Sequence, residues 1–132
     1  MVNSVRRPDL IFPQLSYQII GILFSVYNEL GPGHHERYYQ RSVAQALREI
    51  KLPFKEQVSF PLKFRTALIG RYQLDFLVDE KIVLELKKGD NFSKRHIDQV
   101  LQYLKSTNLK LAILANFAKS GVKFKRIINF EG

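Results

Sequence analysis

The alternation of apolar and polar residues divides the chain into three amphipathic segments and several short apolar runs. Apolar residues recur at helical spacing over residues 14–30, 35–50 and 93–106, which predicts three helices. Gly31-Pro32-Gly33 ends the first helix, and Ser93 is a candidate N-cap of the third. The core-facing residues predicted for the first two helices are Tyr17, Ile20, Leu23, Phe24, Tyr27 and Leu30, then Tyr39, Val43, Ala46, Leu47 and Ile50.

The shorter apolar runs predict strands, with Pro61 dividing the first two. These runs cover residues 54–60, 62–66, 71–78, 81–87, 109–115 and 123–128. Two helices, a group of strands, a helix and two further strands indicate an α+β fold of the wider α/β class, with a central mixed sheet flanked by helices. A chain of 132 residues is expected to form a single domain, with 1–13 as an N-terminal extension and 14–132 as the core.

The predicted hairpin of residues 71–78 and 81–87 carries the strongest chemical signal. Side chains alternate along a strand, so Glu85 and Lys87 share one face. If a tight loop covers residues 79–81, residues 78 and 82 pair and Asp75 lies opposite Glu85. Two carboxylates and a lysine would then meet at one point, and such a group can hold a divalent metal.

Polar residues on two of the helices add to this signal. Glu36 lies in line with the apolar residues of its helix, where a carboxylate is costly unless it is paired or bound to metal. The alternative is that Glu36 occupies the first helical turn, where the helix dipole stabilises an acid. On the third helix, Gln99 and Tyr103 are one turn apart, and His96 precedes Gln99 by about one turn. A histidine such as His96 is by itself more typical of a structural or solvent-facing role than of a base.

Composition and charge narrow the classes of partner. The chain has no cysteine, which excludes a disulfide framework or a zinc–thiolate site and suits the reducing cytoplasm, where we expect the protein. No apolar run is long enough to span a bilayer, so no membrane partner is expected. The net charge of +9, with no acid between Asp98 and Glu131, favours polyanion binding, although solubility alone is the alternative. The aromatic residues Phe60, Phe64, Tyr72 and Phe76 are more typical of a core than of a surface on which bases stack.

Taken in chain order, these residues resemble a known family. The series is Gly33-x-x-Glu36-x-x-Tyr39, then Asp75, then Glu85-x-Lys87, then His96-x-x-Gln99-x-x-x-Tyr103. It resembles the PD-(D/E)xK nuclease superfamily and, within it, the small bacterial proteins named for a G-x-x-E-x-x-Y motif. The Q-x-x-x-Y element is similar to that of the RecB-like branch. The similarity runs from about Leu30 to Asn129, and Leu74 stands where the nominal pattern has a proline.

The resemblance implies a restriction-endonuclease-like core and a metal-dependent nuclease. Such an enzyme would hydrolyse phosphodiester bonds, in DNA ahead of RNA, with a water activated by Mg²⁺ or Mn²⁺. Asp75 and Glu85 would hold the metal together with the backbone carbonyl of Leu86. Glu36 would join them directly, through water, or at a second metal.

The remaining implied roles concern the water, the phosphate and the nucleic acid. Lys87 would position or deprotonate the attacking water and stabilise charge on the phosphate. Gln99 would orient that water or Lys87, and Tyr103 would support the site or contact the substrate backbone. The residues expected to bind nucleic acid are Lys88, Arg95, Lys119, Lys123, Lys125 and Arg126.

Two other interpretations of the chain stay open. The fold could serve as a nucleic-acid-binding module or subunit without catalysis, although carboxylates facing phosphate argue against this. The chain could also be structural, with residues 14–30 as a dimerisation surface and the acids incidental. The chain is small for a nuclease that acts alone on duplex DNA, and a homodimer would place two sites against two strands.

Overall fold

The computed structural model describes residues 11–130, which form three helices and five strands. Most of the expected extension 1–13 therefore lies outside the described residues. Each predicted helix is present, and the third begins at the predicted cap, where the Ser93 side chain accepts a hydrogen bond from the His96 N–H. The bounds are α1 Pro13–Leu30, α2 Glu36–Glu49, β1 Phe54–Phe64, β2 Ala67–Val78, β3 Ile82–Lys88, α3 Lys94–Thr107, β4 Leu111–Ala118 and β5 Gly121–Ile128.

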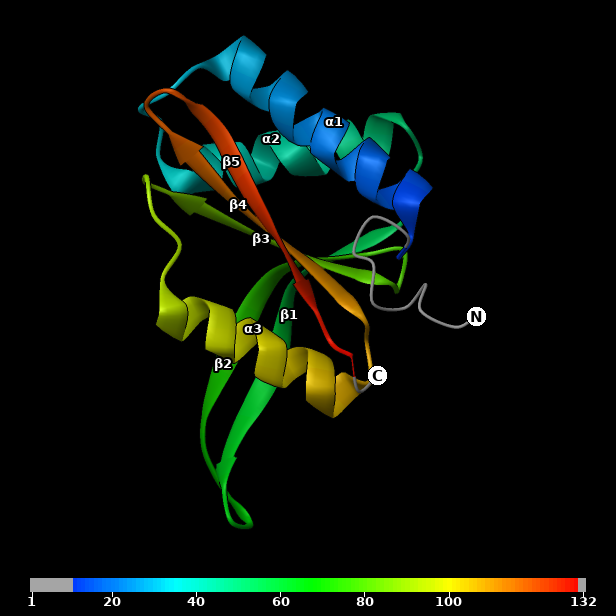
Figure 1. Cartoon of the computed structure of the whole chain (residues 1–132), viewed down its shortest axis with the longest axis vertical. Coiled ribbons are helices and arrows are strands. Elements are labelled where there is room, and N and C mark those ends of the chain that lie inside the picture. The colour runs from blue at the N-terminus through cyan, green and yellow to red at the C-terminus, as the bar shows by residue number, and fades with distance from the viewer. Residues whose placement is uncertain (1–10, 131–132) are drawn as a thin grey trace.

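The strands form one mixed sheet in the order β1-β2-β3-β4-β5, with α1 and α2 on one face and α3 on the other (Figure 1). β3 and β4 run parallel, and α3 is the crossover between them. The other neighbours pair antiparallel. The predicted α+β fold with a mixed sheet between helices is thus confirmed.

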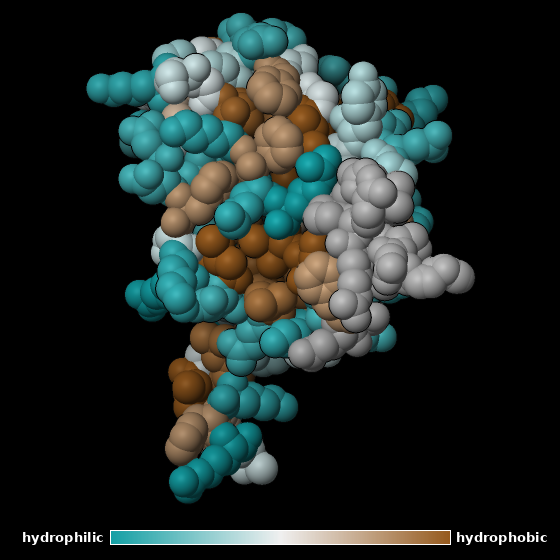
Figure 2. Space-filling model, viewed as in Figure 1, coloured by the Kyte–Doolittle hydropathy of each residue, from teal (hydrophilic) through white to brown (hydrophobic). Residues whose placement is uncertain are grey.

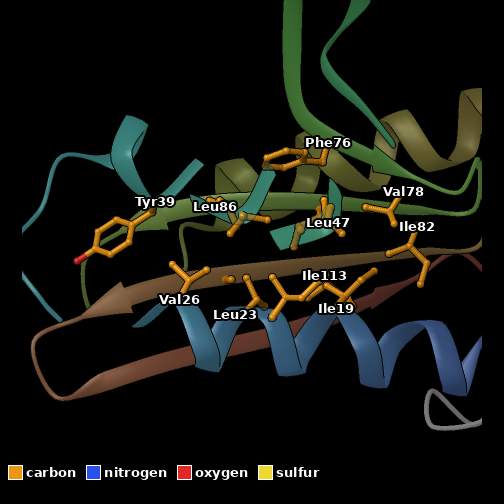
Figure 3. Packing of buried hydrophobic residues seen from close by; sticks show 14 of the residues in the cluster. Ile19, Leu23, Val26, Tyr39, Leu47, Phe76, Val78, Ile82, Leu86 and Ile113 are labelled. Carbon is orange, nitrogen blue, oxygen red and sulfur yellow. The ribbon is translucent and has the colours of Figure 1, made fainter. Parts of the chain in front are cut away.

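The first helix buries only part of the predicted face: Leu23 is buried as predicted, and Ile20 and Tyr27 are partly buried against the core. Tyr17 and Phe24 are exposed, while Ile19, Leu23 and Val26 are buried against the sheet (Figure 3). Apolar residues extend around much of this helix, so periodicity alone leaves two faces open and contact with the sheet decides between them.

The second helix follows its prediction more closely. Tyr39, Val43 and Leu47 are fully buried, as predicted, and they pack in the same cluster as the buried face of α1. Ile50 is exposed because it follows the last helical residue as the C-cap. The Tyr39 ring also stacks on Phe117 of β4, with ring centroids 4.2 Å apart, which fixes the start of α2 beside the carboxyl end of β4.

The division of the first strand at Pro61 is wrong, since β1 is continuous from Phe54 to Phe64. Among the described strands β1 lies at the edge of the sheet beside β2, and an edge strand tolerates a proline wherever the missing N–H would point away from its neighbour. The predicted strand 62–66 likewise includes Arg65 and Thr66, which form the turn that leads into β2. The predicted core position of Phe64 is also wrong, because this side chain is 58% exposed.

Candidate active site

The candidate site lies where β2 separates from β3. Val78 pairs with Ile82, as the predicted loop requires, and the ladder continues to Phe76 and Leu84. One residue further, the Asp75 N–H donates to Glu85 Oε1 over 2.5 Å, and the Leu86 N–H donates to Asp75 Oδ2 over 2.7 Å. The two carboxylates therefore replace ladder hydrogen bonds at the fork between the strands.

Protein donors reach every oxygen of these two carboxylates. Gln40 Nε2 donates to Asp75 Oδ1 over 3.0 Å, and the Tyr72 hydroxyl donates to Glu85 Oε2 over 3.0 Å. His96 Nε2 lies 2.7 Å from the same Glu85 oxygen. Since Glu85 is 2% exposed, these contacts fix its orientation within the fork.

Burial and mutual repulsion perturb the ionisation of the site. Burial raises the pKa of Asp75 from 3.8 to about 7, and the negative charges of Glu85 and Glu36 contribute to this raised pKa. The Leu86 N–H and the positive charge of Lys87 act in the opposite direction. Burial and the neighbouring Glu85 also raise the pKa of Tyr72, so its hydroxyl stays protonated and can donate to the carboxylate.

The start of α2 places two polar side chains beside Asp75. Glu36 is the first helical residue, which agrees with the interpretation that it lies in the first turn, and it is close enough to act on the pKa of Asp75. Gln40 follows one turn later on the same side. Tyr39 anchors this turn, because its hydroxyl donates to the Gly31 carbonyl over 2.6 Å.

A pocket of about 350 Å³ opens beside the carboxylates. Tyr72 and His96 line it and also contact Glu85, so they stand between the fork and the solvent. Its charged lining is basic, from Lys87, Lys88 and Arg95. The remaining lining residues are Asn91, Phe92, Ser93, Gln99 and Asn116.

Comparison with known proteins identifies the family of the chain. A sequence model of the PD-(D/E)XK nuclease superfamily matches residues 13–127, which include all of the residues at the fork. The chain belongs to the PD-(D/E)XK nuclease superfamily. The match does not extend to the narrower G-x-x-E-x-x-Y group, so that resemblance stays a prediction.

Two solved structures are similar to this superfamily member. One is the crystal structure of SSO0001, with a TM-score of 0.49 and 12% identity, covering 88% of this chain and 78% of that one. The other is an alkaline exonuclease, LHK-Exo, from Laribacter hongkongensis, with a TM-score of 0.47 and 10% identity, covering 86% of this chain and 82% of that one. Comparison with curated proteins gives no significant match. Within residues 11–130, no helix has the length and apolarity needed to cross a membrane.

The pairing of β3, β4 and β5 shows which of the predicted nucleic-acid-binding residues of this PD-(D/E)XK chain lie on the same face of the sheet as the site. Asn116 of β4 pairs with Lys87 on one side and Lys123 on the other, and Leu114 pairs with Glu85 and Lys125. Paired residues share a face, so Lys123 and Lys125 lie on the same face as the site.

The other predicted nucleic-acid-binding residues are placed differently. Lys88 and Arg95 line the pocket, whereas Lys119 lies in the turn between β4 and β5. Arg126 is next to Lys125 on β5, so it faces the opposite side of the sheet. It is half-buried there, with its guanidinium over the ring of Phe124. The structure therefore does not bring Arg126 to the face that carries Glu85 and Lys87.

Tyr103 is not brought to the carboxylates either. It is buried two turns beyond His96, and its ring packs edge-on against Phe60 with the centroids 5.2 Å apart. Burial raises its pKa, and the charges that act on it belong to Glu80 and Lys55, not to the carboxylates of the fork. Tyr103 thus contributes to the packing beneath α3, while Gln99 of the same motif lines the pocket.

The donor chemistry of the fork suits a hard divalent cation. Within residues 11–130, no three His, Asp or Glu side chains converge as a ready set of metal ligands. Each carboxylate oxygen has two lone pairs. Both Asp75 oxygens and Glu85 Oε1 accept one hydrogen bond each, so each of them keeps a lone pair that could bind a cation. Carboxylate oxygens are the ligands that Mg²⁺ and Mn²⁺ prefer. The pKa of Asp75 is raised first by burial and then by the negative charges of Glu85 and Glu36, which a cation would offset.

Sequence patterns assign no role to three residues that contact the carboxylates. Gln40 follows Glu36 by four positions, and this helical spacing is the signal that identifies it. His96 stands in the motif series three positions before Gln99, but the sequence favours only a structural or solvent-facing role for it and does not predict its contact with Glu85. Tyr72 gives none, because a regular strand would place residues 72 and 75 on opposite faces.

Proposed function

We propose that the chain is a metal-dependent nuclease that hydrolyses phosphodiester bonds, with DNA as its substrate ahead of RNA. The observation that carries this proposal is the pair of buried carboxylates, Asp75 and Glu85, next to a basic pocket whose lining residues Tyr72 and His96 contact Glu85. Burying two acids together costs stability unless their charge serves a ligand, and a cation is the ligand that carboxylates bind. Membership of a nuclease superfamily supports the same reaction.

In this proposal each polar group has a physical task. Asp75 and Glu85, with Glu36 nearby, would hold Mg²⁺ or Mn²⁺, and the Leu86 carbonyl is a further candidate ligand. A bound cation would supply a water of lowered pKa and polarise the phosphoryl oxygen. Gln40 holds Asp75 in place through its hydrogen bond to Oδ1.

The residues of the pocket would act on the phosphate and the water. Lys87 is exposed at the end of β3, where its positive charge already acts on Asp75, so it can stabilise the developing charge of the phosphate. Gln99 lines the same pocket and is a candidate to orient the water. His96 and Tyr72 keep Glu85 in one orientation, which preorganises the site.

A nucleic-acid-binding module without catalysis is a second candidate. Glu85 accepts from three protein groups: the Asp75 N–H, the Tyr72 hydroxyl and, as placed, His96. Such saturation is typical of a structural carboxylate, and it reduces the capacity of Glu85 to bind a cation. In this alternative the basic pocket would bind phosphate and no bond would be cleaved.

One experiment separates the two functions. Single-stranded, duplex and branched DNA, with an RNA counterpart, are incubated with the wild type and with Asp75→Ala, Glu85→Ala and Lys87→Ala in Mg²⁺ or Mn²⁺. Lys110→Ala is the matched control, because Lys110 is exposed and precedes β4 at the end of the strand opposite to Asn116. The nuclease proposal expects metal-dependent cleavage that the three site variants lose and the control keeps, with circular dichroism verifying folding. Metal-independent binding without cleavage in the wild type would favour the module.

A further inference from the structure

The β1–β2 hairpin projects from the body of the protein as a two-stranded arm beyond the site (Figure 1). It departs from the sheet at Gln57 and Asp75. The register pairs Glu56 with Phe76 and Val58 with Leu74, and it omits Gln57, whose φ is 50°. The residue that opens the fork between β2 and β3 therefore also marks the base of the arm.

The arm is basic throughout its length. Residues 57–74 contain Lys63, Arg65 and Arg71 and no acidic residue. Two such arms would repel each other, whereas a phosphate backbone complements this charge. Charge therefore favours nucleic acid over a second copy of the chain as the occupant.

One face of the arm is apolar from the pocket to the tip. Tyr72, which lines the pocket, pairs with Phe60, and β1 continues on that face through Leu62 to Phe64. At the tip, Phe64 is 58% and Ile69 67% exposed. The projecting end shows apolar as well as polar surface (Figure 2). An exposed aromatic ring on a basic ribbon is the combination on which unpaired bases stack.

The turn at the tip holds an arginine in an unfavourable backbone conformation. Arg65 has a φ of 56°, in the left-handed region where glycine is favoured. Its guanidinium lies 4.8 Å from the centre of the Phe64 ring. The left-handed φ makes glycine an unstrained substitute here, so the Arg65 side chain can be removed without distorting the turn.

We infer that the arm binds the nucleic-acid strand that leaves the pocket, with Phe64 as a stacking surface and Arg65 at the turn as a phosphate contact. Lys63 and Arg71 lie on the opposite face of the arm and add positive charge to it. This inference rests on the proposed function, since it concerns the substrate of the same site. Tyr72 is five residue steps from Ala67 at the tip, which gives a reach of at most about 17 Å at about 3.3 Å per residue, because the register shifts between Leu62 and Lys63. At about 3.4 Å per stacked nucleotide, the tip reaches about five nucleotides from the pocket.

The test is the binding of fluorescent single-stranded oligodeoxynucleotides of graded length, measured by anisotropy in EDTA. Metal is omitted, so the arm can be assessed whether or not the protein cleaves. The variants are Phe64→Ala, Phe64→Trp and Arg65→Gly, the last of which removes the charge without straining the turn. Tyr17→Ala and Lys110→Ala are controls, because Tyr17 is an exposed aromatic residue on α1 and Lys110 an exposed lysine outside the arm.

The arm is expected to matter for long strands alone. With strands of about twenty nucleotides, Phe64→Ala should weaken binding roughly fivefold or more, and Phe64→Trp should restore it. Arg65→Gly should make the slope of log binding constant against log salt concentration less steep by about 0.7. It should leave the protein as stable as the wild type or more stable. Strands of about four nucleotides do not reach the tip, so Phe64→Ala and Arg65→Gly should bind them with the affinity of the wild type.

Three results would overturn the inference. The first is unchanged affinity of the arm variants for long strands, and the second is an equal loss for short and long strands. The third is a dimeric wild type that light scattering shows to become monomeric in Phe64→Ala, which would assign the tip to contact between copies. Failure of the proposed function would be seen separately, as length-dependent binding in EDTA without cleavage in Mg²⁺.

Discussion

Replacing Asp75 with asparagine should stabilise the metal-free protein at neutral and alkaline pH while removing one of the proposed metal ligands. The asparagine side chain has nearly the same size and can keep both hydrogen bonds. Its oxygen would accept from the Leu86 N–H, and its amide would donate to Gln40 once the Gln40 amide turns over to present its oxygen. The substitution therefore removes the charge and little else.

The magnitude follows from the pKa of Asp75, which is raised from 3.8 to about 7 in the folded protein. An acid with a raised folded-state pKa contributes its full stability below the unfolded pKa and loses it as the pH rises through the folded pKa. The wild type thus loses stability between about pH 4 and pH 7, whereas Asp75→Asn does not. A shift of about three units at 1.36 kcal/mol each gives an upper limit of about 4 kcal/mol above pH 7.

The assay is urea unfolding of both proteins in EDTA across a series of pH values, followed by circular dichroism. The difference in free energy of unfolding should be near zero at about pH 4 and should grow in favour of Asp75→Asn until it levels above about pH 7. Addition of Mg²⁺ should then stabilise the wild type more than the variant, because a ligand of the folded state adds RT ln(1 + [L]/Kd).

Two outcomes would refute this reasoning. If the difference in free energy of unfolding does not vary with pH, then burial of the Asp75 charge does not destabilise the folded protein. A variant less stable than the wild type at pH 8 would show that the carboxylate hydrogen bonds outweigh the cost of burying the charge. Mg²⁺ that stabilised both proteins equally would remove Asp75 from the proposed metal ligands without affecting the pH argument.

Three shorter predictions concern neighbouring residues. Lys87→Ala should abolish cleavage but change the free energy of unfolding by less than about 0.5 kcal/mol, as expected for an exposed side chain, and Lys110→Ala should change neither. Tyr103→Phe should retain cleavage, and a loss of cleavage in this variant would instead assign the hydroxyl to catalysis. Tyr103→Ala should lower the free energy of unfolding in urea by about 3–5 kcal/mol, because the ring is packed in the core. Glu36→Gln should lower the pKa of Asp75, since the charge of Glu36 raises it. The measurement is NMR titration of the Asp75 carboxyl in EDTA, and an unchanged pKa would show that Glu36 is too far away to act on Asp75.

The sequence by itself determined the helices, the hairpin register and the pairing of the two central acids. These depend on local information: the period of the apolar residues, the Ser93 cap and a loop of residues 79–81 that fixes residue 78 against residue 82. That register brings Asp75 level with Glu85, although the ladder ends one pair earlier and the contact is made by the Glu85 side chain. The motif spacing also sufficed to indicate the superfamily that the sequence match shows.

The tertiary structure decided which faces are buried and which groups surround the acids. The buried face of α1 depends on contact with the sheet, because apolar residues extend around much of that helix. Tyr72 reaches Glu85 because β1 and β2 leave the sheet at Gln57 and Asp75, and no local pattern specifies that departure. The arm is likewise a product of the departure, which leaves Phe64 in solvent although its sequence pattern is that of a core residue. Burial is a property of the whole packed chain, so the raised pKa of Asp75, on which the proposed chemistry depends, was decided by the fold and not by the motif.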